Sequence, residues 1–140
     1  MSAVKQVIVM RNDLGMRKGK MIAQGAHASI AFLTRRLKRA CSTNIPGLPD
    51  GYTERQRVAT LLDPEIAWIE GSFAKVCVKV GSEEELLEIF QKAKDAGLET
   101  HLITDSGLTE FHGEPTNTCV GIGPDLSEKI DPITGHLTLL

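Results

Sequence analysis

Residues 5–33, "KQVIVMRNDLGMRKGKMIAQGAHASIAFL", join a short apolar run to a long amphipathic stretch, and this junction decides the fold class. The four consecutive apolar residues at 7–10 predict a buried β-strand. The stretch that follows predicts a helix from about Gly19 to about Cys41. At 100° per residue, one stripe of this helix is apolar and is expected to pack: Ile22, Ala26, Ser29, Leu33 and Leu37. The opposite side is polar and available: Lys20, Gln24, His27, Arg35 and Lys38.

Strand and helix patterns alternate through the rest of the chain. "FAKVCVKV" at 73–80 predicts a strand with one better buried face. "SEEELLEIFQKAKDAG" at 82–97 predicts a helix that Ser82 and Glu85 cap and Gly97 ends. "ETHLIT" and "TNTCVGIG" predict two further strands. This order is typical of an α/β sheet with at least one parallel crossover.

Length and composition favour one globular domain over residues 1–140, since 41% of the residues are hydrophobic. Residues 42–51 predict a loop, and residues from about 43 to 70 predict a helical insertion interrupted around Asp63 and Pro64. The apolar runs are too short to span a membrane, so we expect a soluble, cytoplasmic protein. Three cysteines without a CxxC spacing fit reduced thiols with a packing role.

The charge is unevenly distributed along the chain. Residues 1–50 carry nine Lys or Arg against two Asp, whereas residues 51–140 carry seven basic and sixteen acidic residues. Such a separation suits a polyanionic partner that docks on one side. Chance clustering of solvated charges is the alternative.

Two clusters are candidate sites. "GMRKGK" at 15–20 has only three residues between its glycines and no Ser or Thr after it, so it is not a nucleotide P-loop, although a helix start with basic neighbours suits an anion. Lys20, Gln24 and His27 project from one side of this helix. The second cluster is "TDSGLTEFHGEPTNT" at 104–118, directly after a predicted strand, where α/β folds place their sites.

Ordinary structural roles compete with these functional interpretations. A helical histidine is more often structural than catalytic, and Asp105 in a D-S-G sequence also fits a simple turn. The threonines at 109, 116 and 118 also fit turn and strand positions. The four histidines show no close metal-ligand pattern with the cysteines, and there is no G-x-S-x-G motif.

Together the two clusters resemble the type II peptidyl-tRNA hydrolase family. The matching pieces run from residue 6 to 140, outside the insertion: "VIVMRNDLGMRKGKMIAQGAHA", Trp68, "KVCVKV", "SEEELLEI", "TDSGLT", "TCVGIGP" and "TGHLTLL". The resemblance implies a three-layer α/β/α sandwich with a four-stranded mixed sheet and often a homodimer. It also implies hydrolysis of the ester that joins a peptide to the terminal ribose of tRNA, without metal or other cofactor.

By position, the family's functional residues match Lys20, His27, Asp105, Thr109 and Thr118. Asp105, within hydrogen-bond reach of a water or of His27, would activate the attacking water. Lys20 and the helix N-terminus would stabilise the oxyanion. The threonine hydroxyls would orient water or substrate. Phosphate contacts with tRNA are expected from the basic first half of the chain: Arg17, Lys18, Gln24, Arg35 and Lys38, with Arg36 and Arg39 as further candidates.

The chain departs from the family's usual D-A-G-R/K-T-Q at Leu108 and Glu110. Leu108 either weakens a phosphate contact or packs into a longer loop. Two other functions stay open: a catalytically weak member that acts as a protein-interaction or regulatory module, and a nucleotide-binding protein without hydrolase activity.

Overall fold

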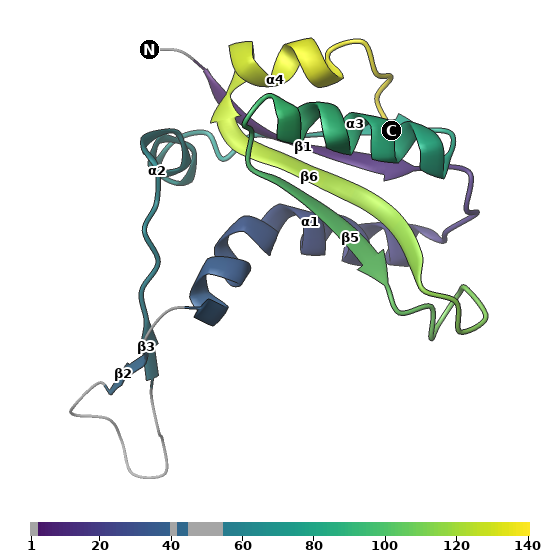
Figure 1. Cartoon of the computed structure of the whole chain (residues 1–140), viewed down its shortest axis with the longest axis horizontal. Coiled ribbons are helices and arrows are strands. Elements are labelled where there is room, and N and C mark those ends of the chain that lie inside the picture. Colours follow the sequence, from purple (N-terminus) through teal and green to yellow (C-terminus); the bar gives the residue numbers. More distant parts are fainter. Residues whose placement is uncertain (1–2, 40–41, 45–54) are drawn as a thin grey trace.

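A computed structural model describes residues 3–39, 42–44 and 55–140. Its main sheet has the strand order β4-β1-β6-β5, formed by β1 (Val4–Arg11), β4 (Lys75–Val80), β5 (Thr100–Asp105) and β6 (Thr116–Leu126) (Figure 1). β1 pairs in parallel with β4 and antiparallel with β6, which also pairs antiparallel with β5. The predicted four-stranded mixed sheet with a parallel crossover is confirmed.

Helices lie on both sides of this sheet. α3 (Glu83–Asp95) and α4 (Ser127–Thr134) lie on one side and α1 (Lys18–Arg39) on the other (Figure 1). Alternate residues of β1 therefore enter two apolar clusters, with Val7 and Val9 in one and Ile8 and Met10 in the other. This agrees with the predicted α/β arrangement. The helix α4 was not predicted from the sequence, because it is short and contains a proline.

The packed face of α1 is not the apolar stripe that the sequence predicted. Ile22 is 72% exposed, whereas the buried positions of the helix are Gln24, Ala28, Ala31 and Phe32. Small residues decide this orientation because they let the helix approach the sheet closely. A Cβ atom at Gly121 of β6 would overlap the Ala28 carbonyl. The helix therefore brings Ala28 against β6 and leaves Ile22 exposed.

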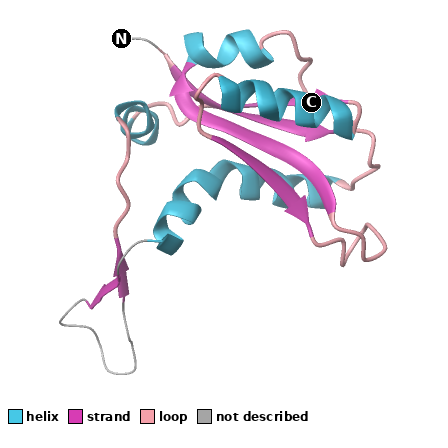
Figure 2. Cartoon of the chain, in the orientation of Figure 1, coloured by secondary structure: helices cyan, strands magenta, loops and turns pink. Residues whose placement is uncertain are grey.

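The insertion is less helical than predicted. Its described part begins with two short antiparallel strands, β2 (Ser42–Asn44) and β3 (Arg55–Arg57), which lie apart from the main sheet (Figure 2). A helix, α2 (Asp63–Glu70), starts at the position where an interruption was expected, because Pro64 suits a first helical turn. Trp68 of α2 is buried and packs edge-to-face on Phe32. Residues 45–54 of the predicted loop and insertion lie outside the described residues.

The segments that carry the candidate clusters meet at one end of the sheet, where β1 and β5 finish and β6 starts. The register pairs Met10, near the end of β1, with Cys119, and Asp105, at the end of β5, with Thr116. α1 begins seven residues after β1 ends. The first turns of α1 therefore lie beside the end of β5 and the start of β6. Within the described residues, no helix is long and apolar enough to cross a membrane.

Candidate active site

A lysine, an aspartate and a threonine from distant parts of the chain meet at this end of the sheet. Lys20 Nζ donates hydrogen bonds to Asp105 Oδ1 at 2.8 Å and to Thr109 Oγ1 at 2.9 Å. The side chains of Lys20 and Asp105 are each 12% exposed. An ion pair so poorly hydrated is held in one geometry, yet it still has an opening to solvent.

The turn after β5 fixes the Asp105 carboxylate. The Gly107 N–H donates to Asp105 Oδ2 at 2.9 Å, and Gly107 has φ +83°, in the left-handed region that favours glycine. The hydrogen bond from Lys20 lowers the pKa of Asp105 despite partial burial, and bonds from Gly107 and Gln24 lower it further. Asp105 is thus both a turn residue and a carboxylate that stays ionised to lower pH than an ordinary aspartate.

A buried pair of side chains supports Asp105 from behind. The Thr118 hydroxyl donates to Gln24 Oε1 at 2.6 Å, and Gln24 Nε2 donates to Asp105 Oδ1 at 3.1 Å. Thr118 is 0% and Gln24 2% exposed. The hydroxyl donor fixes the orientation of the amide, so that its NH₂ group faces the carboxylate. Neither side chain is accessible to a macromolecule, and both belong to the support of the site.

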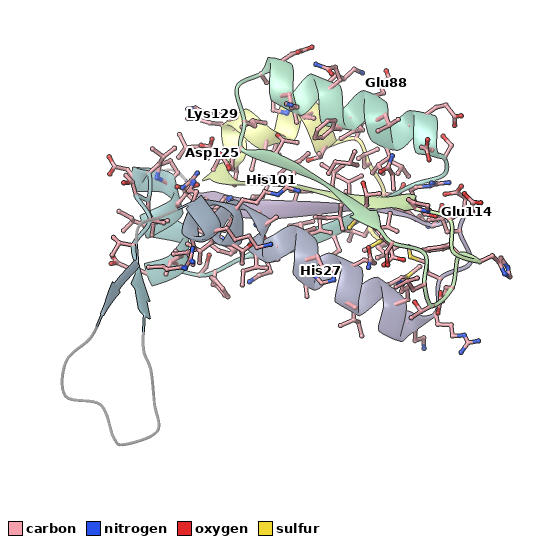
Figure 3. The ribbon with its side chains drawn as sticks, turned by 60° about the horizontal axis from the view of Figure 1, so that its bottom comes forward. His27, Glu88, His101, Glu114, Asp125 and Lys129 are labelled. Carbon is pink, nitrogen blue, oxygen red and sulfur yellow. The ribbon has the colours of Figure 1, made fainter. Side chains whose placement is uncertain are left out.

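The sequence-predicted residues therefore divide into two groups. The structure brings together Lys20, Asp105, Thr109 and Thr118. His27 is not among them: it is exposed midway along α1 (Figure 3), and Asp105 bonds to Lys20, Gln24 and Gly107 instead.

The residues predicted to contact tRNA are placed differently from one another. Arg17, Lys18, Arg35 and Lys38 are exposed along α1 and its approach. Gln24, also predicted to contact tRNA, is inside the site. The spacing of the sequence is consistent with this position, because Gln24 lies four residues after Lys20 and residues four apart in a helix face the same side.

The rim of the site carries Leu108 and Glu110, at which the chain departs from the pattern of the family that it resembles. Leu108 is 84% exposed, so it does not pack into the loop. Glu110 accepts a hydrogen bond from the Arg17 backbone N–H at 3.5 Å and lies 3.8 Å from the Arg17 guanidinium. Phe111 places its ring centre 5.6 Å from Lys20 Nζ. The loop therefore covers the lysine on one side.

A second ion pair braces the loop between β1 and α1, and the sequence analysis missed it. Arg11, 8% exposed, binds Asp13 through two hydrogen bonds and donates to the Asn117 carbonyl at 3.0 Å. The hydrogen bond with Asp13 raises the pKa of Arg11 and lowers that of Asp13. Arg11 thus joins the end of β1 to the start of β6, one residue before Thr118.

The chemistry of these groups suits attack by water on an ester. A cation, an ionised carboxylate and a hydroxyl converge within hydrogen-bond distance. The nearby Cys119 thiol is no nucleophile, because it is buried and burial raises its pKa to about 12. Within the part of the chain that the structure describes, no three His, Cys, Asp or Glu side chains form a metal-binding group.

Comparison with known proteins gives one consistent result. The family model described as peptidyl-tRNA hydrolase PTH2 matches residues 4–140. The chain is 45% identical over 139 residues to a peptidyl-tRNA hydrolase of Methanocaldococcus jannaschii, covering 98% of this chain and 100% of the relative. It is 43% identical to one of Methanothermobacter thermautotrophicus, with 98% and 100% covered, and 39% identical to one of Halobacterium salinarum, with 97% and 99% covered.

Proposed function

The chain belongs to the peptidyl-tRNA hydrolase PTH2 family, and we propose on this basis that its Lys20–Asp105–Thr109 site hydrolyses the ester between a peptide, or an N-blocked aminoacyl group, and tRNA. The observation that carries the assignment to this site is the position of Lys20 Nζ, 2.8 Å from one oxygen of Asp105 and 2.9 Å from the Thr109 hydroxyl. The reaction releases the peptide and frees the tRNA for another round of charging.

Lys20 stabilises the negative charge that develops on the ester carbonyl oxygen. Its ammonium group has three N–H donors, and two of them bind Asp105 and Thr109. The third is free for the carbonyl oxygen, and a preorganised donor in a partly dehydrated site is worth more than one in water. The two protein bonds hold the ammonium in place before the substrate arrives.

Asp105 activates the water. Among the described residues its Oδ2 accepts only the Gly107 N–H, so a lone pair is left for a water proton. The water oxygen attacks the carbonyl carbon, and its proton passes through the carboxylate to the ribose oxygen as the ester bond breaks. Asp105 is ionised at neutral pH and can therefore accept this proton, and Gln24 and Thr118 hold its orientation from the buried side.

tRNA approaches from the side of α1. Arg17, Lys18, Arg35 and Lys38 are exposed on or beside this helix, and His27 lies between them. Across the sheet, α3 begins with three glutamates, Glu83–Glu85, which repel phosphate. The uneven charge of the chain thus becomes a spatial separation, with the basic side next to the catalytic pair.

The direct experiment measures release of an N-acetyl-aminoacyl group from tRNA by the purified protein, with the unblocked aminoacyl-tRNA as control. We expect turnover of the blocked substrate only. A folded protein that turns over neither substrate would favour the alternative of a protein-interaction or regulatory module.

We also propose that the protein acts in the cytoplasm and that it forms a homodimer, as the resemblance implies. α1, α2 and β4 border an apolar groove of about 710 Å³, lined by Ile22, Ile30, Ile69 and Phe73 among others. Ile22 is 72% exposed there. Light scattering should give the mass of two chains, and Ile22→Glu should give that of one. Val58→Glu, at an exposed site outside the groove, should remain dimeric.

A further inference from the structure

A second group of basic side chains lies at the far end of α1 from the catalytic pair. This distal cluster consists of Arg35, Lys38 and Arg57, all of them exposed. We propose that the distal cluster binds the phosphate backbone of the double-helical part of the tRNA substrate. The proposal rests on the proposed function and specifies which part of the substrate this surface takes.

Contacts with other elements hold both arginines in place. Arg35 donates to His101 Nδ1 at 2.6 Å and to the Leu102 carbonyl at 3.2 Å, so it lies against β5. Arg57 donates to the Leu37 and Lys38 carbonyls at 2.8 and 3.1 Å, which ties β3 to the end of α1. The remaining guanidinium N–H donors of each arginine are available to phosphate oxygens.

The neighbouring Arg36 shows what a structural arginine looks like here. It binds both carboxylate oxygens of Glu65 and lies 3.2 Å from Glu99. In contrast, no member of the distal cluster forms an ion pair with a carboxylate of the described residues. Within the described residues, these three positive charges are not paired with a carboxylate and can neutralise an external anion.

The distance from the catalytic pair selects the part of the substrate. Lys20 and Lys38 are eighteen residues apart in one helix, which is about 27 Å at 1.5 Å per residue. A strand stacked as in B-form DNA advances about 3.4 Å per nucleotide, so this distance covers about eight nucleotides, and more in A-form RNA, whose rise is shorter. That length reaches past the short single-stranded 3′ end of tRNA and into its helical arm.

The side chains around the distal cluster favour phosphate over bases. Single-stranded RNA is gripped by exposed aromatic rings that stack on bases. The rings that pack near this end of α1, Phe32 and Trp68, are each 2% exposed. Phe73, beyond Trp68, is 51% exposed, but Lys75 Nζ lies 3.3 Å from the centre of its ring and occupies one face. The described surface thus offers charge and not stacking, as suits a duplex backbone.

The test compares two substrates that carry the same N-acetyl-aminoacyl ester. One is full-length tRNA, and the other is a CCA trinucleotide without any helix. We expect Arg35→Gln with Lys38→Gln to raise KM for the tRNA and to reduce the slope of log(kcat/KM) against log[salt] by about two. The trinucleotide should be hydrolysed as by the wild type. The matched control, Lys92→Gln with Lys94→Gln on α3, removes the same charge. It should leave KM and the salt slope unchanged for both substrates.

An equal change on both substrates, or none on either, would overturn the proposal. Lys38→Glu alone is a second variant that should fold normally, because the Lys38 side chain makes no hydrogen bond or ion pair with a described residue. It should also raise KM for the tRNA substrate and leave hydrolysis of the trinucleotide unchanged. If the wild type hydrolyses neither ester, the proposed function fails. A salt titration of tRNA binding then still tests the proposal. The slope of log K for tRNA binding against log[salt] should be smaller by about two in the double variant than in the wild type.

Discussion

Lys20 Nζ lies 2.8 Å from Asp105 Oδ1, although 85 positions separate these residues in the chain. The pair forms because β5 ends beside the first turn of α1. Each partner is only 12% exposed, so each determines the electrostatic surroundings of the other. The catalytic account depends on this mutual effect, and the pH dependence of activity reports it.

Replacing Lys20 by Gln should lower kcat by about 10²–10³-fold, as does removal of other oxyanion donors. It should also raise the pKa of Asp105 toward its ordinary value, because the lysine is the main cause of the lowered pKa. A base with a lowered pKa stays ionised to lower pH, so the acid limb of kcat/KM should move to higher pH in the variant. The measurement is a pH–rate profile for both proteins.

The control for this variant is Lys18→Gln, which removes an exposed charge two residues earlier in the same helix. It should leave kcat and the acid limb unchanged and alter KM only. Equal effects of the two variants, confined to KM, would mean that Lys20 merely binds tRNA.

The buried support of Asp105 should be sensitive to loss of one hydroxyl. Thr118→Val leaves Gln24 Oε1 without its donor in a site that is 0–2% exposed. We expect a loss of about 1–3 kcal/mol in the free energy of unfolding together with a lower kcat, and Thr118→Ser should restore both. Thr104→Val, on the exposed side of β5, is the control. If kcat stays at the wild-type value while stability falls, Thr118 serves the core alone.

Glu65→Gln should lower the free energy of unfolding by about 1–3 kcal/mol, because it removes the buried charge that Arg36 binds, while Arg36 keeps its contact with Glu99. Glu65 is 1% exposed, and both its oxygens bind Arg36. Denaturant unfolding measures the effect. Glu70→Gln, exposed in the same helix, should change stability little. Equal stability of the two variants would show that the Arg36 pair does not anchor α2.

Leu108 is predicted to face the substrate, because it is 84% exposed at the rim of the site. Leu108→Arg with Glu110→Gln should lower KM for peptidyl-tRNA and steepen the fall of kcat/KM with salt, since it adds two units of positive charge beside the catalytic pair. Assays at several salt concentrations measure the slope. An unchanged slope would place the tRNA backbone away from this loop.

The sequence alone predicts much of this fold, because the order of elements is a local signal. The strand at 7–10, the capped helix after Ser82 and its end at Gly97 all have short-range causes, and the structure confirms them. Lys20, Asp105 and Thr109 were also identified, through the resemblance of the two clusters to a family. Their contact is a consequence of strand order.

The failures have a common physical cause, because tertiary packing overrides local periodicity. The most apolar stripe of α1 was expected to pack, yet close approach between Ala28 and Gly121 turns the smaller side toward the sheet. That rotation exposes Ile22 and carries Gln24 into the site. The strands β2 and β3 are three residues each and were too short for a pattern.

The most direct test of the central claim is single-turnover hydrolysis of N-acetyl-aminoacyl-tRNA by the wild type and by Asp105→Asn, at enzyme concentrations that saturate the substrate. The account predicts that the variant binds tRNA as the wild type does but hydrolyses the ester about 10²–10⁴-fold more slowly, because the amide cannot accept the water proton. Hydrolysis by Asp105→Asn at the wild-type rate would contradict the account and remove Asp105 from the mechanism.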